Sequence, residues 1–432
     1  MVWHKQGKTA ATAMDALALA VGYGASSLPA KVLPTDQGFL TLRYLLVGGS
    51  VCFLLSRAWQ KVKNRSLSLS DPLCLAWCAF GCGSLLSGAF HDLDTFLQGL
   101  WLLFGLPLFF FALLPRYLGN QTNLFTGLAL AGAFTLFNAF SVIVEPDLSY
   151  PYHGVWANSN YIGILAATQA AGLFGLLSAA LDCRRWQLAT TAVLGLLASS
   201  LAMILLSGSR TSFLSFSACL MLFLMLRVRR NGPGILLNAA LGGCGAVLVV
   251  CALGWQEPFM GLADGILNKQ EKQGENVLSG RDEIWKDTIL NSCWLGHGSG
   301  YFPQRYGIGP HNVVIGMLGT YGILAVIFFV IFAVLSVWRA WQHAWRAPPD
   351  ELCADAPLMV VAGYWVLAMG EASGALGGGL SLAFYTMVGV ILNASLMGTR
   401  IPAPRRLRGV PAAHLNHSRL PSFIEGEGGK AV

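Results

Sequence analysis

The sequence predicts an all-α polytopic membrane protein with about twelve transmembrane helices. Two observations lead to this prediction, namely the scarcity of charged residues and the number of long apolar runs. Of the 432 residues, 55% are hydrophobic and 11% are charged, against roughly 25% charged residues in soluble globular domains. The mean hydropathy is +0.57. Such a chain has too few polar groups to cover a folded surface in water, so soluble enzymes and nucleic-acid-binding proteins are excluded.

The apolar runs define the expected spans. A helix that crosses the hydrocarbon core needs about 20 mostly apolar residues. The segments that meet this requirement lie near 10–29, 38–56, 72–90, 95–114, 123–144, 160–181, 188–208, 211–226, 234–254, 312–337, 356–374 and 379–398. The first and eleventh are the least regular, because the first contains Asp15 and the eleventh ends in Glu371 and a glycine-rich stretch. The first segment is longer than the core of a cleavable signal peptide, so we expect it to remain as a helix.

The basic residues predict the orientation of the spans. With both termini in the cytoplasm, about 20 of the 28 lysine and arginine residues fall on the inner side. The remaining basic residues, which fall on the outer side, are Lys31, Arg43, Arg210, Lys269, Lys272, Arg281, Lys286 and Arg305. This distribution accounts for the net charge of +7 without a nucleic-acid partner.

The spans divide the chain into four expected parts. Residues 1–254 form transmembrane helices 1–9, and residues 255–311 form one large outer loop between helices 9 and 10. Residues 312–399 form transmembrane helices 10–12, and residues 400–432 form a basic, proline-rich cytoplasmic tail.

The large loop contains one predicted helix start. Ser279 is the expected N-cap, with Asp282 and Glu283 in the first turn, where negative charge suits the helix dipole. Arg281 and Trp285 are four positions apart and therefore share one face of this helix.

Arg210 lies in a polar segment between the seventh and eighth spans. An arginine at membrane depth is costly, and it usually serves a function with an anionic partner. No acidic residue lies close to it in the sequence, and the forked guanidinium group fits a phosphate. The alternative is that Arg210 extends to the outer lipid headgroups. Arg43, in the second span, has the same two interpretations.

Three residues of the outer loops are candidates for chemistry. His311 stands before Asn312 where the chain re-enters the membrane, and a histidine there can act as a general base near neutral pH. The alternative is a histidine with structural hydrogen bonds only. His153 competes with His311 for the role of base, and Arg281 is either a substrate contact or a solvated charge paired with its acidic neighbours.

Two further patterns stay open. His91-Asp92-Leu93-Asp94 matches the DxD pattern that holds a divalent metal in many sugar-transfer enzymes, with a solvated turn as the alternative. Glu371 belongs either to a proton relay or to a loose outer helix end. The sequence contains no Walker loop, HExxH or GxSxG motif, so neither ATP-driven transport nor the common hydrolase mechanisms are indicated.

In their order and topology these segments resemble the O-antigen ligase and polymerase superfamily of bacterial envelopes. The matching segments are residues 207–211 (SGSRT), 280–285 (GRDEIW), 296–302 (GHGSGYF) and His311-Asn312, with Gly319 and Gly322 in the helix that follows. Residues 154–161 (GVWANSNY) resemble a further family segment, in which proline usually stands where this sequence has Ser159. The resemblance covers about residues 150–335, and the remainder of the chain matches only in hydropathy.

The resemblance implies a glycosyltransferase of lipopolysaccharide or exopolysaccharide biosynthesis in the bacterial inner membrane. The donor would be a glycan on undecaprenyl pyrophosphate, presented in the periplasm, and no cofactor, nucleotide sugar or obligatory metal would be needed. The acceptor would be lipid A core in a ligase, or a second lipid-linked repeat in a polymerase, and the large loop is compact for an enzyme that admits lipid A core. A lipid-glycan flippase is the non-enzyme alternative, although flippases place their polar groups near the bilayer midplane.

The resemblance also implies roles for individual residues. His311 would take the proton of the acceptor hydroxyl, and Arg210 and Arg281 would stabilise the charge of the leaving pyrophosphate. The expected substrate-binding residues are Arg43, Asn158, Asn160, Trp285, Arg305 and Asn312.

Overall fold

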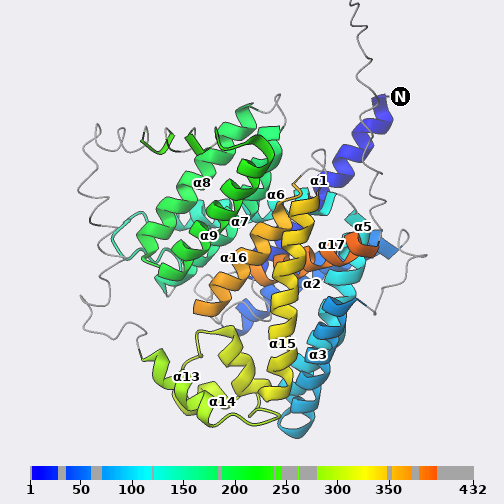
Figure 1. Ribbon diagram of the computed structural model, residues 1–432, viewed down its shortest axis with the longest axis vertical. Coiled ribbons are helices and arrows are strands. Elements are labelled where there is room, and N and C mark those ends of the chain that lie inside the picture. The colour runs from blue at the N-terminus through cyan, green and yellow to red at the C-terminus, as the bar shows by residue number, and fades with distance from the viewer. Residues whose placement is uncertain are drawn as a thin grey trace, which may run out of the picture. The chain divides into compact units, whose positions relative to one another are not determined.

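The computed structural model describes most of the predicted spans. The described residues are 2–27, 36–59, 71–118, 121–156, 158–182, 187–234, 280–347, 353–371 and 379–396, with a few single residues between 236 and 261. All regular secondary structure in these residues is helical (Figure 1), which confirms the predicted all-α class. The contacts discussed below lie within one unit of the chain, Met1–Asn393.

The described residues form a series of helices along the chain. They are α1 (Val2–Ala25), α2 (Asp36–Trp59), α3 (Pro72–Phe90), α4 (Leu93–Leu100), η2 (Trp101–Gly105), η3 (Pro107–Leu113), α5 (Leu114–Leu118), α6 (Thr122–Val144), α7 (Ser159–Asp182), α8 (Gln187–Ser207), α9 (Arg210–Asn231), α13 (Arg281–Leu290), α14 (Tyr301–Tyr306), α15 (Val313–Arg346), α16 (Ala356–Gly370) and α17 (Gly379–Leu396). The run from α4 to α5 is continuous and becomes π-helical around Pro107, a residue that has no N–H to donate.

Seven described helices are long and apolar enough to cross a membrane, and four shorter apolar helices accompany them. Every predicted segment except the ninth overlaps a described helix, and in the ninth, 234–254, only residues 234, 236, 237, 240 and 242–244 are described. The protein therefore has the helices of a multi-pass membrane protein. The total of twelve spans and the orientation of the termini remain predictions.

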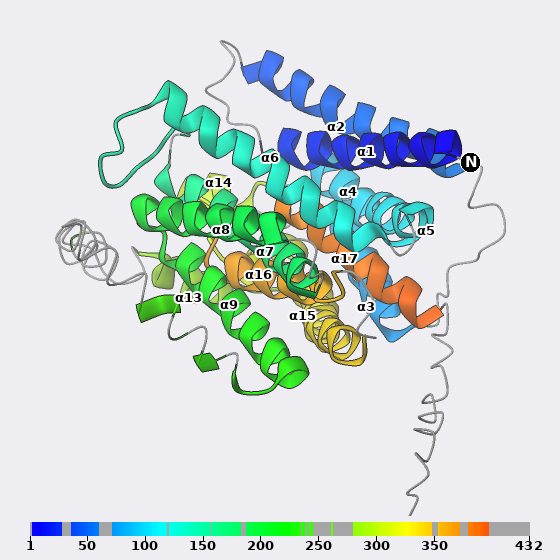
Figure 2. The same ribbon diagram turned by 90° about the horizontal axis from the view of Figure 1, so that it is seen from above.

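Helix α7 lies among α6, α8, α9 and α16 (Figure 2). In its most apolar stretch 89% of the residues are buried, against 28% in α8. Small residues allow this close packing. Gly163 leaves no room for a side chain beside Ser207 and Ser209, and Gly363 of α16 contacts Ala171. Consequently, the first turns of α7 and α9 lie side by side.

A second packing centre lies around Trp77 of α3. Its ring makes edge contacts with Phe111 of η3, Phe332 of α15 and Tyr385 of α17, at centroid distances of 4.7–5.6 Å. Its indole N–H donates to the carbonyl of Leu102 at 2.8 Å, which satisfies the one polar atom of the buried ring.

Helix α15 is interrupted at Gly322, whose φ of 86° and ψ of −178° are not helical. Residues 293–298 of the preceding loop lie along this break. His297 N–H donates to the carbonyl of Gly319 at 2.9 Å, and Ile323 N–H donates to the carbonyl of Cys293 at 3.0 Å. These bonds replace the helical bonds that the break removes. The loop is thereby joined to α15, which begins two residues after His311, and α13 and α14 lie beside the start of this helix (Figure 1).

Ion pairs are found near the C-terminal ends of α7 and α9. Arg227 of α9 contacts Asp182 of α7 at 2.6 Å, and Arg230 contacts the fully buried Asp355 before α16 at 2.6 Å. These pairs join the C-terminal ends of α7 and α9 to each other and to the start of α16.

Two expected boundaries need correction. Ser279, the expected N-cap of the loop helix, lies outside the described residues. Gly280, with φ of 75°, holds the N-cap position, because the chain enters α13 through a left-handed turn that glycine adopts without strain. Asp282 and Glu283 do lie in the first turn, as predicted. The eleventh segment was predicted to reach residue 374, whereas α16 ends at Gly370 and Glu371 is extended.

Gly322→Ala should destabilise the protein by roughly 1–3 kcal/mol or more. The positive φ strains any other residue, and a Cβ there would collide with the backbone N of Gly296. Gly195→Ala in α8 is the matched control, since its Cβ would meet no atom within 4 Å. Thermal unfolding in detergent measures the difference. Equal apparent Tm values for the two variants would contradict this account of the helix break.

Candidate functional site

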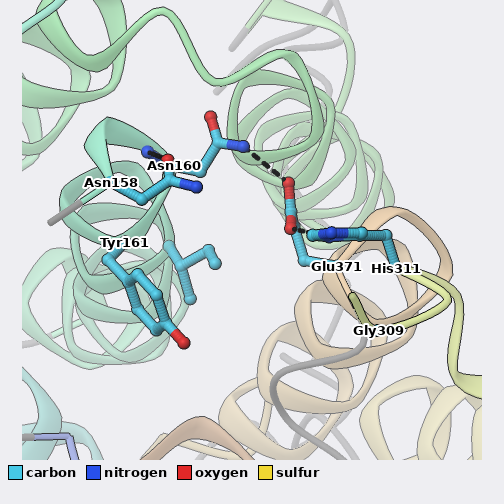
Figure 3. A pocket seen from close by; sticks show the side chains of 7 residues that line it. Asn158, Asn160, Tyr161, Gly309, His311 and Glu371 are labelled. Atoms are coloured by element: carbon cyan, nitrogen blue, oxygen red, sulfur yellow. Dashed lines mark hydrogen bonds and ion pairs between the residues drawn. The ribbon is translucent and has the colours of Figure 1, made fainter. Parts of the chain in front are cut away.

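Glu371 directly follows α16, and its side chain is only 8% exposed. Its Oε2 lies 3.1 Å from Nδ1 of His311, and its Oε1 accepts a hydrogen bond from the Asn160 side-chain amide at 2.9 Å (Figure 3). A guanidinium nitrogen of Arg281 lies 3.9 Å from Oε1. These three partners come from the turn before α15, the start of α7 and the start of α13. One buried carboxylate therefore joins three segments that are far apart in the sequence.

His311 has a left-handed backbone, with φ of 52°. This conformation costs a residue other than glycine about 1–2 kcal/mol, although histidine adopts it more often than most. Hydrogen bonds hold the residues on both sides of His311. The Trp285 indole N–H donates to the carbonyl of Pro310 at 2.7 Å, and the Asn312 amide donates to the carbonyl of Met369 at 3.0 Å. Trp285 and Asn312 therefore hold the backbone on both sides of His311.

Asn312 also caps α15. Its side-chain oxygen accepts hydrogen bonds from the N–H groups of Val314 at 2.9 Å and Ile315 at 3.2 Å, which have no partner in the first helical turn. Since the same side chain binds Met369 near the end of α16, Asn312 fixes the start of α15 to the end of α16.

Arg281 is the first residue of α13. It donates to the carbonyl of Gly370 at 3.0 Å, one of the last carbonyls of α16, and such groups lack helical partners. Its side chain is 24% exposed. Arg281 thus caps α16 and places positive charge beside Glu371.

Arg210 is the first residue of α9, after the N-cap Ser209. The next residue, Thr211, packs so closely against Gly370 that a Cβ at Gly370 would collide with it. The start of α9 therefore lies beside the same end of α16 that Arg281 caps. The two arginines predicted to act together come from distant parts of the sequence, and the helices that they begin, α9 and α13, both start beside the end of α16.

A pocket of about 290 Å³ opens beside these groups. Its lining residues are Asn158, Asn160, Tyr161, Ile164, Gly309, His311 and Glu371. In Figure 3, the residues of α7 lie on one side of the pocket, and His311 and Glu371 lie on the other. The Asn158 side chain accepts a hydrogen bond from the N–H of Asn160 at 2.9 Å, which fixes the first turn of α7. The structure thus brings together Asn158, Asn160 and His311 from the predicted set.

Other predicted residues lie outside the pocket lining. Arg305 contacts Asp287 at 2.8 Å within the loop. Arg43 lies partly exposed in α2, and His153 is exposed in the loop before α7.

The DxD segment has a structural role in the described fold. Asp92 caps α4 by accepting from the N–H of Thr95 at 2.7 Å, and this bond is the main cause that lowers the pKa of the Asp92 carboxyl. Among the described residues, no group of three or more His, Cys, Asp or Glu side chains is placed to hold a metal.

Asp287 contributes pH-dependent stability to the loop. Hydrogen bonds from Tyr306 and then Arg305 lower the pKa of its carboxyl. A folded-state pKa below the unfolded value of about 3.9 gives stability that is present above that pH and is lost as the pH falls through the folded pKa. Asp287→Asn should therefore lower the apparent Tm at neutral pH, with a smaller difference near pH 3. Arg305→Gln should show the same trend, and a constant difference in both variants would contradict it.

The middle of the chain matches a known family. Residues 192–330 match the sequence model described as O-antigen ligase. This segment runs from α8 into α15 and includes Arg210, Arg281 and His311, whereas Asn160 and Glu371 lie outside it. No curated protein matches the chain. The match covers about a third of the chain, and over this segment the protein is similar to the O-antigen ligase and polymerase superfamily of membrane proteins.

Proposed function

We propose that this protein transfers a glycan from undecaprenyl pyrophosphate to an acceptor sugar hydroxyl at the periplasmic face of the bacterial inner membrane. The observation that supports this most directly is the position of His311. In a chain similar to this superfamily, a histidine that contacts a carboxylate and lines a pocket is placed to act as a general base.

The reaction uses the two sides of the site differently. His311 takes the proton of the acceptor hydroxyl, which contributes about 10²–10⁴-fold to the rate. The acceptor oxygen bonds to the anomeric carbon of the donor glycan, and the bond from this carbon to the pyrophosphate oxygen breaks. The leaving pyrophosphate gains negative charge, which Arg210 and Arg281 stabilise. The apolar helices hold the polyprenyl chain.

Arg210 and Arg281 are both placed to bind an anion, for the same structural reason. Each is the first residue of its helix, so its charge adds to that of the helix N-terminus, which attracts anions. In addition, Arg281 contacts Glu371 at 3.9 Å, whereas the arginines at the opposite end of α9 contact their carboxylates at 2.6 Å. A guanidinium group has five N–H donors, and this looser pair leaves donors of Arg281 for a phosphate.

The pocket suits one sugar unit of the acceptor. Its volume of about 290 Å³ lies just below the roughly 300–1,000 Å³ of ligand pockets. Asn158 and Asn160 offer amide groups to sugar hydroxyls, and Tyr161, which is 46% exposed, offers a ring face. We propose a ligase that uses lipid A core as acceptor. The alternative is a polymerase of the same superfamily, which extends lipid-linked repeats.

The first test is transfer by the purified protein. A lipid-linked glycan donor is offered with lipid A core or with a second lipid-linked repeat, and the products are resolved by mass. We expect glycan on lipid A core, and His311→Ala should lower the rate by about 10²–10⁴-fold. His153→Ala, at the exposed outer histidine, is the control and should react like the wild type.

Three outcomes would change this assignment. Longer lipid-linked chains would identify a polymerase. The absence of both products would contradict the transferase and favour a transporter. Wild-type turnover by His311→Ala would show that His311 is not the base.

Arg210→Ala and Arg281→Ala should each lower kcat by about 10²–10³-fold, because each removes a group that stabilises the developing charge. Arg229→Gln, at the opposite end of α9 where Arg229 stacks on Trp345, is the control and should keep kcat near the wild-type value. Single-turnover rates at saturating donor measure the difference. An unchanged kcat with a raised KM would show that the arginines bind the donor without acting in the transition state.

A further inference from the structure

We propose that Glu371 is a positioning residue of the transfer reaction, which keeps a proton on Nδ1 of His311 and so makes Nε2 the atom that takes the acceptor proton. This inference rests on the proposed function. Glu371 lies outside the segment that matches the family, and the sequence alone left its role open.

The contacts of Glu371 determine which atom donates the proton in its hydrogen bond with His311. The amide nitrogen of Asn160 can only donate, and the guanidinium group of Arg281 is a cation with donors only. Both contacts indicate that Glu371 is a carboxylate, whose oxygens accept a hydrogen bond from each partner. Nδ1 of His311 therefore donates its proton to Oε2 across 3.1 Å. A neutral imidazole carries one proton, so Nε2 keeps its lone pair.

The carboxylate cannot easily turn away from His311. It is buried, and its other oxygen is held by Asn160, whose own backbone N–H is bound to Asn158. The backbone of Glu371 is also fixed, because its N–H donates to the carbonyl of Leu367 at 2.8 Å. Glu371 is thus a rigid acceptor, and it limits the rotation of the imidazole ring.

Nε2 of His311 is available to accept a hydrogen bond from a substrate. Within the described part of the chain it has no protein hydrogen-bond partner, and His311 lines the pocket with 30% of its side chain exposed (Figure 3). A hydroxyl in the pocket can therefore donate to Nε2. When its proton moves there, its oxygen bonds to the anomeric carbon, and the electron pair of the broken bond leaves with the lipid pyrophosphate. The imidazolium that forms lies against the carboxylate of Glu371, which stabilises it.

A double-mutant cycle tests this role. Glu371→Gln has nearly the same size but lacks the charge, so kcat should fall, by no more than the 10²–10⁴-fold that the base itself contributes. The KM for the acceptor should change little. The double variant Glu371→Gln/His311→Ala should be as active as His311→Ala alone, because a residue that acts through the base has nothing left to position.

Controls separate this role from a structural one. Glu145→Gln, at the exposed outer end of α6, should keep wild-type kcat. The apparent Tm of Glu371→Gln shows whether the variant folds. A second measurement uses ¹⁵N-labelled histidine, with the His311 signals assigned by their loss in His311→Gln. The wild type should carry the proton on Nδ1, and Glu371→Gln should show more of the Nε2-protonated form.

The outcomes distinguish the inference from the function on which it rests. If His311→Ala turns over like the wild type, the proposed function fails. If His311→Ala loses activity but Glu371→Gln does not, only the positioning role is overturned. If the loss of kcat in the double variant equals the product of the losses in the two single variants, Glu371 acts independently of His311 and the proposal is overturned. A wild-type His311 that carries its proton on Nε2 would also overturn the proposal.

Discussion

Burying a carboxylate at the end of an apolar helix is costly unless neighbouring groups supply its hydrogen bonds and its counter-charge. At Glu371, Asn160 and His311 supply the hydrogen bonds, and Arg281 supplies the charge. These residues stand at or beside the starts of α7, α15 and α13. The contacts of one carboxylate therefore join the segment before α15, with its histidine, to α7, α13 and α16, and the pocket forms where they meet.

The surrounding structure limits how far this cluster can move. The glycine-rich loop segment lies along the broken helix at Gly322, and Asn312 joins the start of α15 to the end of α16. At the opposite ends of α7 and α9, two arginine–carboxylate pairs at 2.6 Å, each with one fully buried partner, join these helices to each other and to the start of α16. Precise placement of a base and its partners requires support of this kind. By contrast, the Arg281–Glu371 contact is longer, at 3.9 Å, which supports the proposed binding of an anionic substrate by Arg281.

The sequence predicted the helices well, because twenty-residue apolar runs have few other stable forms in a membrane. It also indicated His311, Arg210 and Arg281, through local motifs. It did not reveal the role of Glu371, which lies 60 positions from His311 and 211 from Asn160. A pairing over such distances has no local pattern, and the only signal was a carboxylate at the end of an apolar span. The partner of Arg305, Asp287, which lies 18 positions away, and the break at Gly322 were not predicted either.

We propose that the donor pyrophosphate lies at the starts of α9 and α13 while Glu371 holds His311 toward the acceptor. The most direct test is a cryo-EM structure of the protein in lipid nanodiscs with bound undecaprenyl pyrophosphate. We expect the pyrophosphate within hydrogen-bond distance of Arg210 and Arg281, with Nδ1 of His311 still on Glu371 and Nε2 facing the pocket. A pyrophosphate bound away from both arginines, or a His311 turned away from Glu371, would contradict this account.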